Sequence, residues 1–421
     1  MNFHPQREAL LAEVHARPSS PIEAPTQVTR AAVLSGQDGA ERDRLHMADL
    51  CRQVGVAMPA SGMRWWSAQG DGWQLRWERH SEFSSWTLSR RPGEEEGCGD
   101  LAPLPPDWIA ALPGAVLVLT TIELRLDASG IAVQLDRQEA IGTILLDGAA
   151  TLHTDLRPDA TGVTCFDVTL HVADPILAGR LTLSLLEIET YRLMALLAFP
   201  IAVEAGALLG VIESEVSILA ARLADELGVE DDRALLSRLV ALSGRMEALS
   251  ASTSFRFAAA RAYHEIVRNR IASLREAPAP GMQTIGQFMD RRLGPAMRTC
   301  QSIAEREQSL IERIGRAGQM LNTRIELVTQ AINADLLASM NRRALAQLRL
   351  QRTVEGLSVA AITYYMVSLV TYPLAAAKRG WPTLDTVLIA GLLAPLIAAA
   401  VWFSIRRFTR GIDNESDLMG A

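Results

Sequence analysis

Lysine is nearly absent from this 421-residue chain: Lys378 is the one lysine among 41 basic residues. The abundant arginine has two explanations, planar bidentate binding of phosphate or carboxylate groups or a compositional bias shared with the many alanines. We favour the bias. The net charge is -7, and no basic stripe with interleaved aromatic residues is present, so the sequence excludes a typical nucleic-acid-binding protein.

Cysteine and enzyme motifs are scarce as well. The chain has no CxxC pair and no cluster of histidine with cysteine, because its four cysteines are scattered over Cys51, Cys98, Cys165 and Cys300. This spacing indicates neither a zinc site nor a disulfide framework. The motifs GxxxxGK[ST], GxSxG and HExxH, and GxGxxG after a strand, are missing too. We therefore expect no catalytic residues, no metal and no cofactor, and we do not predict an enzyme.

Two long apolar runs lie near the C-terminal end. Residues 356–377 contain no charged side chain, and residues 384–405 contain only Asp385. Each run is about 33 Å long as a helix, enough to cross a hydrocarbon core of about 30 Å. We predict two transmembrane helices in contact with the lipid bilayer, joined as a hairpin by a short outer turn over 378–383.

The flanking charges give an orientation. The turn contains only Lys378 and Arg379, whereas more arginines lie outside the hairpin: Arg342, Arg343, Arg349, Arg352, Arg406, Arg407 and Arg410. The positive-inside rule then places both termini in the cytoplasm. The start of the chain has no apolar run after a basic region, so we expect no secretory signal. We predict a multi-pass protein of the bacterial inner (cytoplasmic) membrane, with its N-terminal body and its basic-then-acidic tail, 406–421, in a reducing compartment.

A third apolar segment, Leu193–Ile212, competes with these two. It contains Pro200 in its middle and Glu204, which alone would cost about 3 kcal/mol at a bilayer centre. A third span would also move one flanking region to the wrong side of the membrane. We therefore interpret the segment as a buried helix pair broken at Pro200.

The first predicted span has a stripe of small and polar residues on one helix face. Its members recur at helical spacing: Ser358, Ala361, Tyr365, Ser368 and Tyr372. The stripe suits helix–helix packing or a pore lining. We favour packing because the stripe has no ionisable group.

A long helix is predicted ahead of the first span, because no proline occurs between Pro295 and Pro373. Its apolar residues repeat every eleven positions, in the series Leu310, Leu321, Ile332 and the series Ile314, Ile325, Leu336. An eleven-residue repeat keeps an apolar stripe nearly straight or gives it a drift toward right-handed supercoiling. Such a stripe needs a partner, either the helices at 184–275 or the same helix in other subunits. We therefore expect a homo-oligomer.

The N-terminal body is predicted to contain a sheet. Residues 63–90 alternate as three short strands with a tight turn at Gly70–Gly72, and Ala115–Leu126 forms a strand or a strand pair. The fold class is α+β, with an N-terminal α/β cytosolic domain, a helical section, a long stalk helix and a C-terminal hairpin. The predicted boundaries are 1–183 for the cytosolic domain, 184–275 for the helical section, 276–283 for a linker, 284–355 for the stalk, and 356–377 and 384–405 for the spans.

Two N-terminal stretches are candidate ligand sites. Strand alternation places Arg76, Glu78, His80 and Glu82 on one face, which suits either a polar ligand or a solvated, self-paired sheet face. The proline-rich stretch Glu13–Pro25 contains His15 and Arg17, which could contact a ligand. Dense proline also fixes an extended loop or edge strand. For both stretches we favour the explanation without a ligand: a solvated, self-paired sheet face for the first, and a loop or edge strand for the second.

Four separated motifs resemble one protein family. They are "LLAEVHARP…IEAPTQVTRAAVLSG", "LRWERHSEFSSW", "ETYRLMALLAFP" and "DLLASMNRRALAQLRLQRTVEGLSVAAITYY". They are similar to the bacterial membrane-anchored proteins grouped as domain of unknown function family 3422, over almost the whole chain. The resemblance implies a membrane anchor and no particular activity.

The layout also resembles the CorA-type magnesium transporters. Those proteins are pentamers with a cytosolic α/β domain, a stalk helix running into a pore-lining first span, and a lipid-facing second span. Their Gly-Met-Asn signature at the end of the first span is missing here, where the chain reads "VTYPLAAAKRGWP", and Tyr364–Met366 lies too early to replace it. The resemblance implies an assembly of the pentameric kind and a cation as a partner, without the residues that select magnesium.

Two functions follow as hypotheses. The first is a membrane-anchored oligomeric protein whose large cytosolic domain acts in interaction or sensing. The alternative is an ion channel or divalent-cation transporter whose first span lines the pore.

Overall fold

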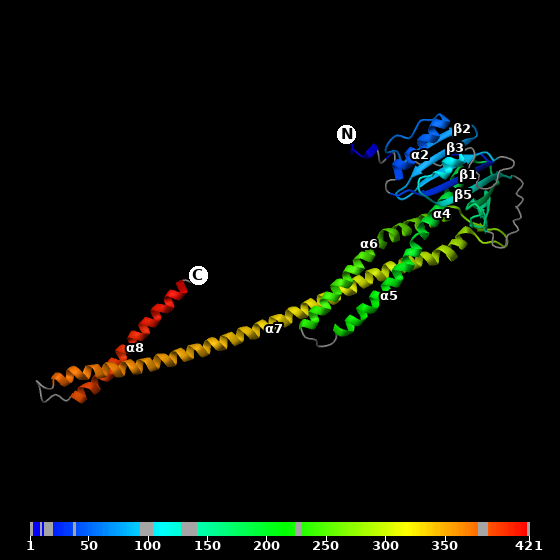
Figure 1. Cartoon of the computed structure of the whole chain (residues 1–421). Helices are drawn as coiled ribbons and strands as arrows, with labels where there is room; N and C mark the ends of the chain where they lie inside the picture. Colours follow the sequence, from blue (N-terminus) through cyan, green and yellow to red (C-terminus); the bar gives the residue numbers. More distant parts are fainter. Residues whose placement is uncertain are drawn as a thin grey trace. The chain divides into compact units, whose positions relative to one another are not determined.

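The computed structural model describes two compact units, residues Met1–Gln319 and Met320–Ala421. The residues described within them are 3–8, 11, 20–36, 39–92, 104–127, 141–223, 229–377 and 386–418. The fold is mixed α+β, with a sheet in the N-terminal part followed by long helices (Figure 1).

The strands of the described residues form one nine-stranded sheet in the order β2-β3-β4-β1-β5-β8-β7-β6-β9. The pairing of β5 with β8 is parallel, and the other strand pairs are antiparallel. The strand bounds are β1 (Thr26–Leu34), β2 (Trp65–Gly70), β3 (Trp73–Arg79), β4 (Ser84–Arg90), β5 (Ala115–Leu126), β6 (Ile141–Leu145), β7 (Ala150–Thr154), β8 (Thr164–Leu170) and β9 (Ala277–Pro278).

The local predictions for these strands are largely confirmed. Three strands, β2 to β4, occupy the stretch over 63–90, and Gly72 has a φ of 74° in the turn between β2 and β3, a backbone angle that glycine adopts without strain. Residues Ala115–Leu126 form one strand, β5. The predicted linker over 276–283 includes β9, which pairs with β6 and so ties this stretch to the sheet edge.

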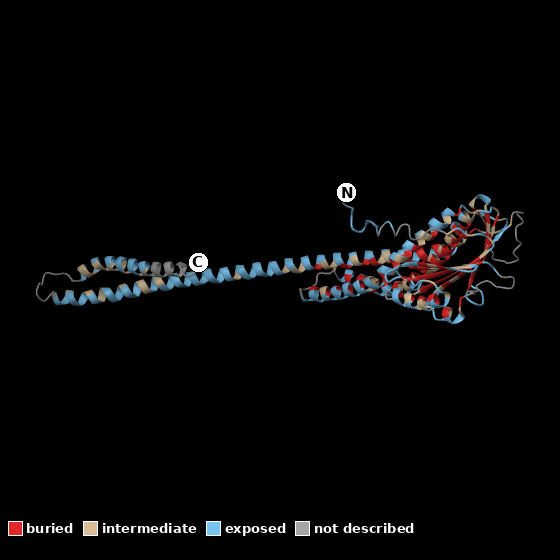
Figure 2. Cartoon of the chain, turned by 90° about the horizontal axis from the view of Figure 1, so that it is seen from above, coloured by how far each residue is buried: buried red, intermediate tan, exposed pale blue. Residues whose placement is uncertain are grey.

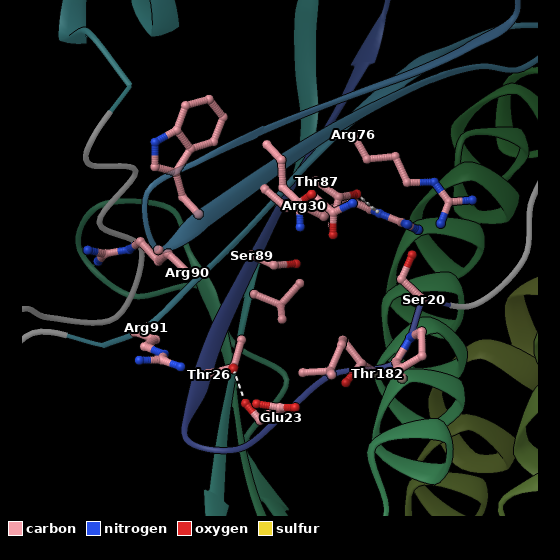
Figure 3. A pocket seen from close by; sticks show the side chains of 18 of the residues that line it. Ser20, Glu23, Thr26, Arg30, Arg76, Thr87, Ser89, Arg90, Arg91 and Thr182 are labelled. Carbon is pink, nitrogen blue, oxygen red and sulfur yellow. Dashed lines mark hydrogen bonds between the residues drawn. The ribbon is translucent and has the colours of Figure 1, made fainter. Parts of the chain in front are cut away.

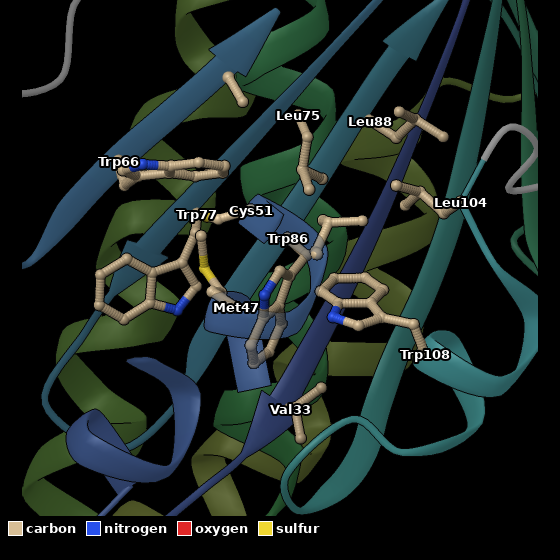
Figure 4. Close-up of a cluster of buried hydrophobic side chains, with 12 residues drawn as sticks. Val33, Met47, Cys51, Trp66, Leu75, Trp77, Trp86, Leu88, Leu104 and Trp108 are labelled. Carbon is tan, nitrogen blue, oxygen red and sulfur yellow. The ribbon is translucent and has the colours of Figure 1, made fainter. Parts of the chain in front are cut away.

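One face of the sheet is packed with tryptophan. A cluster of buried apolar residues lies between the strands and helix α2 (Gly39–Val54), and it includes Met47, Trp66, Trp77, Trp86 and Trp108 (Figure 4). Two indole N–H groups find backbone acceptors: Trp66 Nε1 donates to the Ala57 carbonyl and Trp108 Nε1 to the His46 carbonyl, both at 3.0 Å. These bonds offset the cost of burying polar atoms in an aromatic core. Helix α3 (Pro106–Ala110) contributes Trp108.

Helix α4 (Pro175–Leu196) contacts the sheet at β1 and β5. Its start is defined by Asp174, whose carboxylate accepts hydrogen bonds from the N–H groups of Ile176 (2.9 Å) and Leu177 (3.2 Å), and by Pro175 in the first turn. The cap places the helix start ahead of position 184, where we predicted the helical section to begin. Buried Leu181 and Leu185 lie on this helix.

Helices α5 (Ala198–Leu223) and α6 (Val229–Ser273) follow. The break between α4 and α5 lies at Leu197, three positions before the predicted break at Pro200. Pro200 instead occupies the first turn of α5, where the N–H that proline lacks would have no intrahelical partner. The helix pair is therefore present, and proline begins the second helix rather than ending the first.

Helix α7 (Ile285–Ala377) is continuous over 93 residues. Glu276 caps its start, accepting from the N–H groups of Ile285 (3.1 Å) and Gly286 (2.9 Å). Inside the first unit, α7 is joined to α5 by the ion pair of Arg306 with Glu213 (2.7 Å).

The second unit contains the rest of α7 and helix α8 (Thr386–Leu418). Buried residues are concentrated in the first unit, whereas the side chains described in the second are mostly exposed (Figure 2). Helix α8 continues beyond residue 405, into the stretch that we predicted to be a tail. The predicted outer turn, 378–383, lies outside the described residues.

Three helical stretches are long and apolar enough to cross a membrane, by length and composition: Pro175–Leu223, Ile285–Ala376 and Val387–Arg407. Two of them overlap the predicted spans, 356–377 and 384–405. The first is the α4–α5 pair, which we predicted to be a buried helix pair. That prediction is only partly correct: 33% of the most apolar window of this stretch is buried, and Val203, Leu208 and Val211 of α5 are exposed, although α5 packs against α6.

The cysteines differ from the prediction. Cys51 and Cys300 are free and buried, as expected for reduced thiols, but Cys165 on β8 takes part in a disulfide bond. The spacing rules failed here because they detect clustered cysteines, and a disulfide needs only two that tertiary folding brings together.

Candidate functional site

A row of polar side chains crosses three neighbouring strands on the sheet face opposite the tryptophan cluster. In the antiparallel register, Arg76 of β3 is paired with Thr87 of β4, and Thr87 with Arg30 of β1. Directly opposite residues in an antiparallel pair have Cα atoms about 5 Å apart. The two arginines are therefore about 10 Å apart at their backbones, with Thr87 between them.

This row forms part of the wall of a cavity of about 410 Å³. The cavity lies in the first unit, between the strands β1 to β4 and helix α4, whose Gly179, Thr182 and Leu183 line it. Its described lining includes the four arginines Arg30, Arg76, Arg90 and Arg91, and the two acidic residues Glu23 and Asp71. A positively charged lining is notable because the whole chain has a net charge of -7.

The two arginines of the row point toward α4. Figure 3 shows the Arg30 and Arg76 side chains extending toward the green helix, with the Ser20 side chain beside them, whereas Arg90 extends the opposite way. Arg90 donates from Nε (3.0 Å) and Nη2 (2.6 Å) to Gln27 Oε1, its neighbour in the strand register. The guanidinium groups of Arg30 and Arg76 therefore both lie on the side of the cavity next to α4, whereas that of Arg90 does not (Figure 3).

A segment ahead of β1 closes this side of the cavity. Ile22 N–H donates to the Pro175 carbonyl (2.9 Å) at the start of α4, and Ser20 and Glu23 line the cavity. A Cβ atom at position 179 would clash with the Ser20 carbonyl oxygen, so Gly179 permits the close approach of the two chains. His15 and Arg17, the predicted ligand contacts of the proline-rich stretch, lie outside the described residues.

One carboxylate is shared between the two arginines. Glu78 Oε1 lies 2.6 Å from Arg76 Nη2, and Glu78 Oε2 lies 3.9 Å from Arg30 Nη2. Arg30 also donates from Nε to Thr87 Oγ1 at 2.9 Å. Burial lowers the pKa of Arg30, while the nearby carboxylates of Glu78 and Glu187 act in the opposite direction. The arrangement holds the buried Arg30 guanidinium and the partly buried Arg76 guanidinium beside the shared carboxylate of Glu78.

A second cavity, of about 320 Å³, adjoins the same arginines. Arg30, Arg76 and Leu183 line both cavities, and the second is also lined by Glu187, Tyr191 and Arg270. Arg270 Nε donates to Glu187 Oε2, which joins α6 to α4. The two arginines of the row therefore lie between two cavities beneath the helices.

The prediction that Arg76, Glu78, His80 and Glu82 share one strand face is only partly correct. Strand β3 ends at Arg79, so His80 and Glu82 lie in the turn before β4, where strand alternation no longer applies. Arg76 and Glu78 lie in the row, and His80 lines the second cavity, with its ring stacked on Phe83 at 4.2 Å. Glu82 instead accepts from Tyr263 of α6 (2.9 Å) and pairs with Arg256 (2.7 Å). Part of the face lines the cavities, and part of it attaches α6.

Sequence reasoning missed Arg30, Thr87 and Thr182. Arg30 is the one charged residue of the strand "TQVTRAAVL", which is a local signal for an unusual buried charge. Its position beside Arg76 required the strand order, because the two residues belong to strands that are separated in the sheet by β4. Nothing local in the sequence relates Thr182 of α4 to either of them.

The stripe on the predicted first span lies in the second unit. Ser358 lines a groove with Ile405 of α8, whereas Tyr365 is 69% exposed and Tyr372 is 76% exposed. Ala361 is also exposed and Ser368 is intermediate. Within the described residues, the tyrosines of the stripe therefore remain uncovered.

Among the described residues, no group of three histidine, cysteine, aspartate or glutamate side chains could hold a metal ion.

Comparison with known proteins yields one match. The family model described as "Protein of unknown function (DUF3422)" matches residues 2–412. No curated protein and no solved structure matches the chain.

Proposed function

Because the chain belongs to the DUF3422 family of proteins of unknown function, we propose a function from its surfaces: it is a membrane-anchored protein whose sheet domain acts in the cytosol by interaction or sensing. The observation that carries this proposal is the exposed apolar surface of α7 and α8. Leu357 and Leu369 on α7 are 73% and 67% exposed, and Val387 on α8 is 80% exposed. Transfer of such surface from water into lipid is favourable, at about 25 cal/mol per Å².

The two segments are proposed to cross the bilayer as a helical hairpin. Residues 356–377 have no charged side chain, and each apolar stretch matches the thickness of a bilayer. Both termini then lie on the cytoplasmic side, because arginines are in excess on the outer flanks. The exposed Arg406 lies over the Trp402 ring at 4.7 Å, an aromatic–cation pair suited to a membrane interface.

The α4–α5 stretch is better explained without a membrane. Helix α4 contacts the sheet strands β1 and β5, so its insertion would carry part of the sheet into the hydrocarbon. Helix α5 exposes Glu204 and pairs Glu213 with Arg306. We assign this stretch to the cytosolic domain.

Self-association is part of the proposal. In the first unit, Leu310 and Ile314 of the eleven-residue stripe are 1% and 4% exposed, whereas the later members Ile332 and Leu336 are each 57% exposed. The same repeat thus continues from a covered surface onto an uncovered one. A second copy of the chain is the partner that presents the same stripe, and it would cover this surface with a matching periodicity.

The membrane anchor is tested with Leu369→Arg and Leu392→Arg. Arginine at the centre of a span costs about 2.5–3.5 kcal/mol, so both changes should move protein from the alkaline-carbonate pellet to the supernatant. Leu327→Arg is the matched control, since Leu327 is 61% exposed but lies outside the apolar segment. A wild-type protein that carbonate extracts completely would refute the anchor.

An ion channel or cation transporter is the second candidate, and the exposure of Tyr365 and Tyr372 favours it. In a CorA-type assembly, a stripe left uncovered by α8 would face the axis between subunits. Cation flux into liposomes that Tyr365→Leu or Ser368→Leu abolishes would establish this function. Flux equal to that of empty liposomes would leave the stripe as a helix-packing surface.

A further inference from the structure

The cavity beneath α4 points to a ligand of a definite charge. We propose that the cavity binds a small molecule bearing a phosphate or carboxylate group, with that group held by Arg30 and Arg76. The inference names the ligand class for the proposed sensing role. Its test measures binding alone and so is separate from the test of the membrane anchor.

The positions of the two arginines in the row are the first argument for an anionic ligand. Arg30 and Arg76 approach the cavity from strands on either side of β4, and Thr87 holds the Nε of Arg30 at 2.9 Å. A guanidinium group has five N–H donors in a planar fork that matches the oxygens of carboxylate and phosphate. Two such forks on one wall form a site that an anion with two or more oxygens can bridge.

The charges around Arg30 and Arg76 are the second argument for an anionic ligand. Glu78 lies between the two arginines, but its Oε2 is 3.9 Å from Arg30 Nη2, beyond direct hydrogen-bond distance. The described lining of the cavity contains four arginines against the acidic residues Glu23 and Asp71, so an anion bound there would meet an excess of cationic groups. A bound anion would stabilise the Arg30 guanidinium against the desolvation that lowers its pKa.

The cavity volume and its walls limit the ligand. About 410 Å³ is near the lower end of the range of small-molecule pockets, roughly 300–1,000 Å³. Polar groups without charge, including Ser20, Thr182 and Gln74, also line it and offer hydrogen bonds to the rest of a small polar molecule. Helix α4 and the segment before β1 border the cavity on one side, and its size suits a small molecule.

The experiment uses the full chain in detergent and three probes: inorganic phosphate, citrate, and chloride at matched ionic strength. Binding is measured by isothermal titration calorimetry and by the shift in Tm. Phosphate or citrate should bind and raise Tm, and chloride should not. A response to phosphate alone identifies a phosphate-bearing ligand, and a response to citrate alone identifies a carboxylate-bearing one.

Three variants localise the binding. Arg76→Gln and Arg30→Gln should each weaken the binding of the responding probe by about 10- to 100-fold, because each removes charged hydrogen bonds. Arg64→Gln, which changes an exposed arginine outside the cavity lining, should leave binding unchanged.

Arg30 is only 5% exposed, so circular dichroism must first show that its variant folds. If it does not fold, Arg76→Gln carries the test, because the Arg76 side chain is 14% exposed. The proposal is overturned if neither phosphate nor citrate exceeds chloride in the wild type, or if Arg76→Gln binds the responding probe as tightly as Arg64→Gln does.

Discussion

Tyr263 of α6 donates a hydrogen bond to Glu82 Oε1 across 2.9 Å, although 181 positions separate the two residues. Glu82 Oε2 also lies 2.7 Å from Arg256 Nη2, and the Tyr263 ring stacks on Tyr191 of α4 at 5.3 Å. One carboxylate in the turn between β3 and β4 therefore attaches a helix that follows much later in the chain. This contact positions α6 over the second cavity, where its Arg270 meets Glu187.

Tyr263→Phe should destabilise the first unit by about 1 kcal/mol at neutral pH, the typical net value of one hydrogen bond. Burial, together with Glu82, raises the pKa of Tyr263 to about 12. The fold therefore favours the neutral hydroxyl, and this stabilisation is complete below pH 10, near the unfolded pKa. It is lost between pH 10 and 12 at about 1.4 kcal/mol per pH unit.

The measurement is Tm against pH. Wild-type Tm should fall more steeply than that of Tyr263→Phe above pH 10, so that the two curves meet and then cross before pH 12. Tyr364→Phe, at a tyrosine that is 70% exposed, should follow the wild type throughout. Parallel wild-type and Tyr263→Phe curves up to pH 11 would contradict the prediction.

Gly179→Ala should open the wall of the arginine-lined cavity. The added methyl group would overlap the Ser20 carbonyl oxygen, and such overpacking typically costs about 1–3 kcal/mol. We expect a lower Tm and faster proteolysis near residues 20–25. Gly210→Ala is the matched helical control, since nothing lies within 4 Å of its added Cβ, and it should raise stability by up to about 1 kcal/mol. Equal behaviour of the two variants would show that the Ser20 segment does not pack on α4.

Ile332→Glu and Leu336→Glu should weaken self-association. Both residues continue the eleven-residue stripe and are 57% exposed, so a charge there would be buried without a partner in any stripe-to-stripe contact. Light scattering after gel filtration in detergent should show a shift toward monomer. Leu327→Glu lies off the stripe and should keep the wild-type mass. A monomeric wild type would remove the oligomer from the proposed function.

The disulfide at Cys165 tests the proposed topology. A cytosolic sheet domain lies in a reducing compartment, where structural disulfides are rare, yet Cys165 is disulfide-bonded. We expect this cysteine to be alkylated without prior reduction in acid-quenched cells, and to form the bond after purification in air. Labelling is followed in a variant that lacks Cys51 and Cys300, the free buried cysteines. Labelling in cells only after reduction would place the sheet domain in an oxidising compartment.

Several features could be predicted because they depend on neighbours in the sequence. Alternating residues over 63–90 indicate strands through a period of two, and a tight turn at Gly72 follows from the freedom of glycine. The long proline-free stretch after Pro295 agrees with α7, which is continuous to Ala377. Other local rules misplaced element boundaries. The break between helices α4 and α5 lies at Leu197 rather than at Pro200, because proline is tolerated in the first turn of a helix.

The candidate cavity could not be predicted in the same way. Strand alternation identifies Arg76 as a candidate ligand-binding residue. Whether its sheet face binds a ligand or faces solvent depends on which element packs over that face. The order β3-β4-β1 brings Arg30 into the same row. Helix α4 lies over that row, although its lining residues Gly179 and Thr182 are more than a hundred positions away from Arg76.

By itself, the sequence determined the periodicities of this protein: strands in the N-terminal part, a long helix, and two apolar stretches of membrane-spanning length. Such features arise within a few residues, where side-chain chemistry and backbone geometry act directly. The tertiary structure alone decided that Arg30 and Arg76 share a wall with Thr87 beneath α4, and that Glu82 instead attaches α6. The physical reason is that strand order and helix docking depend on the packing of segments far apart in the chain, which no local pattern specifies.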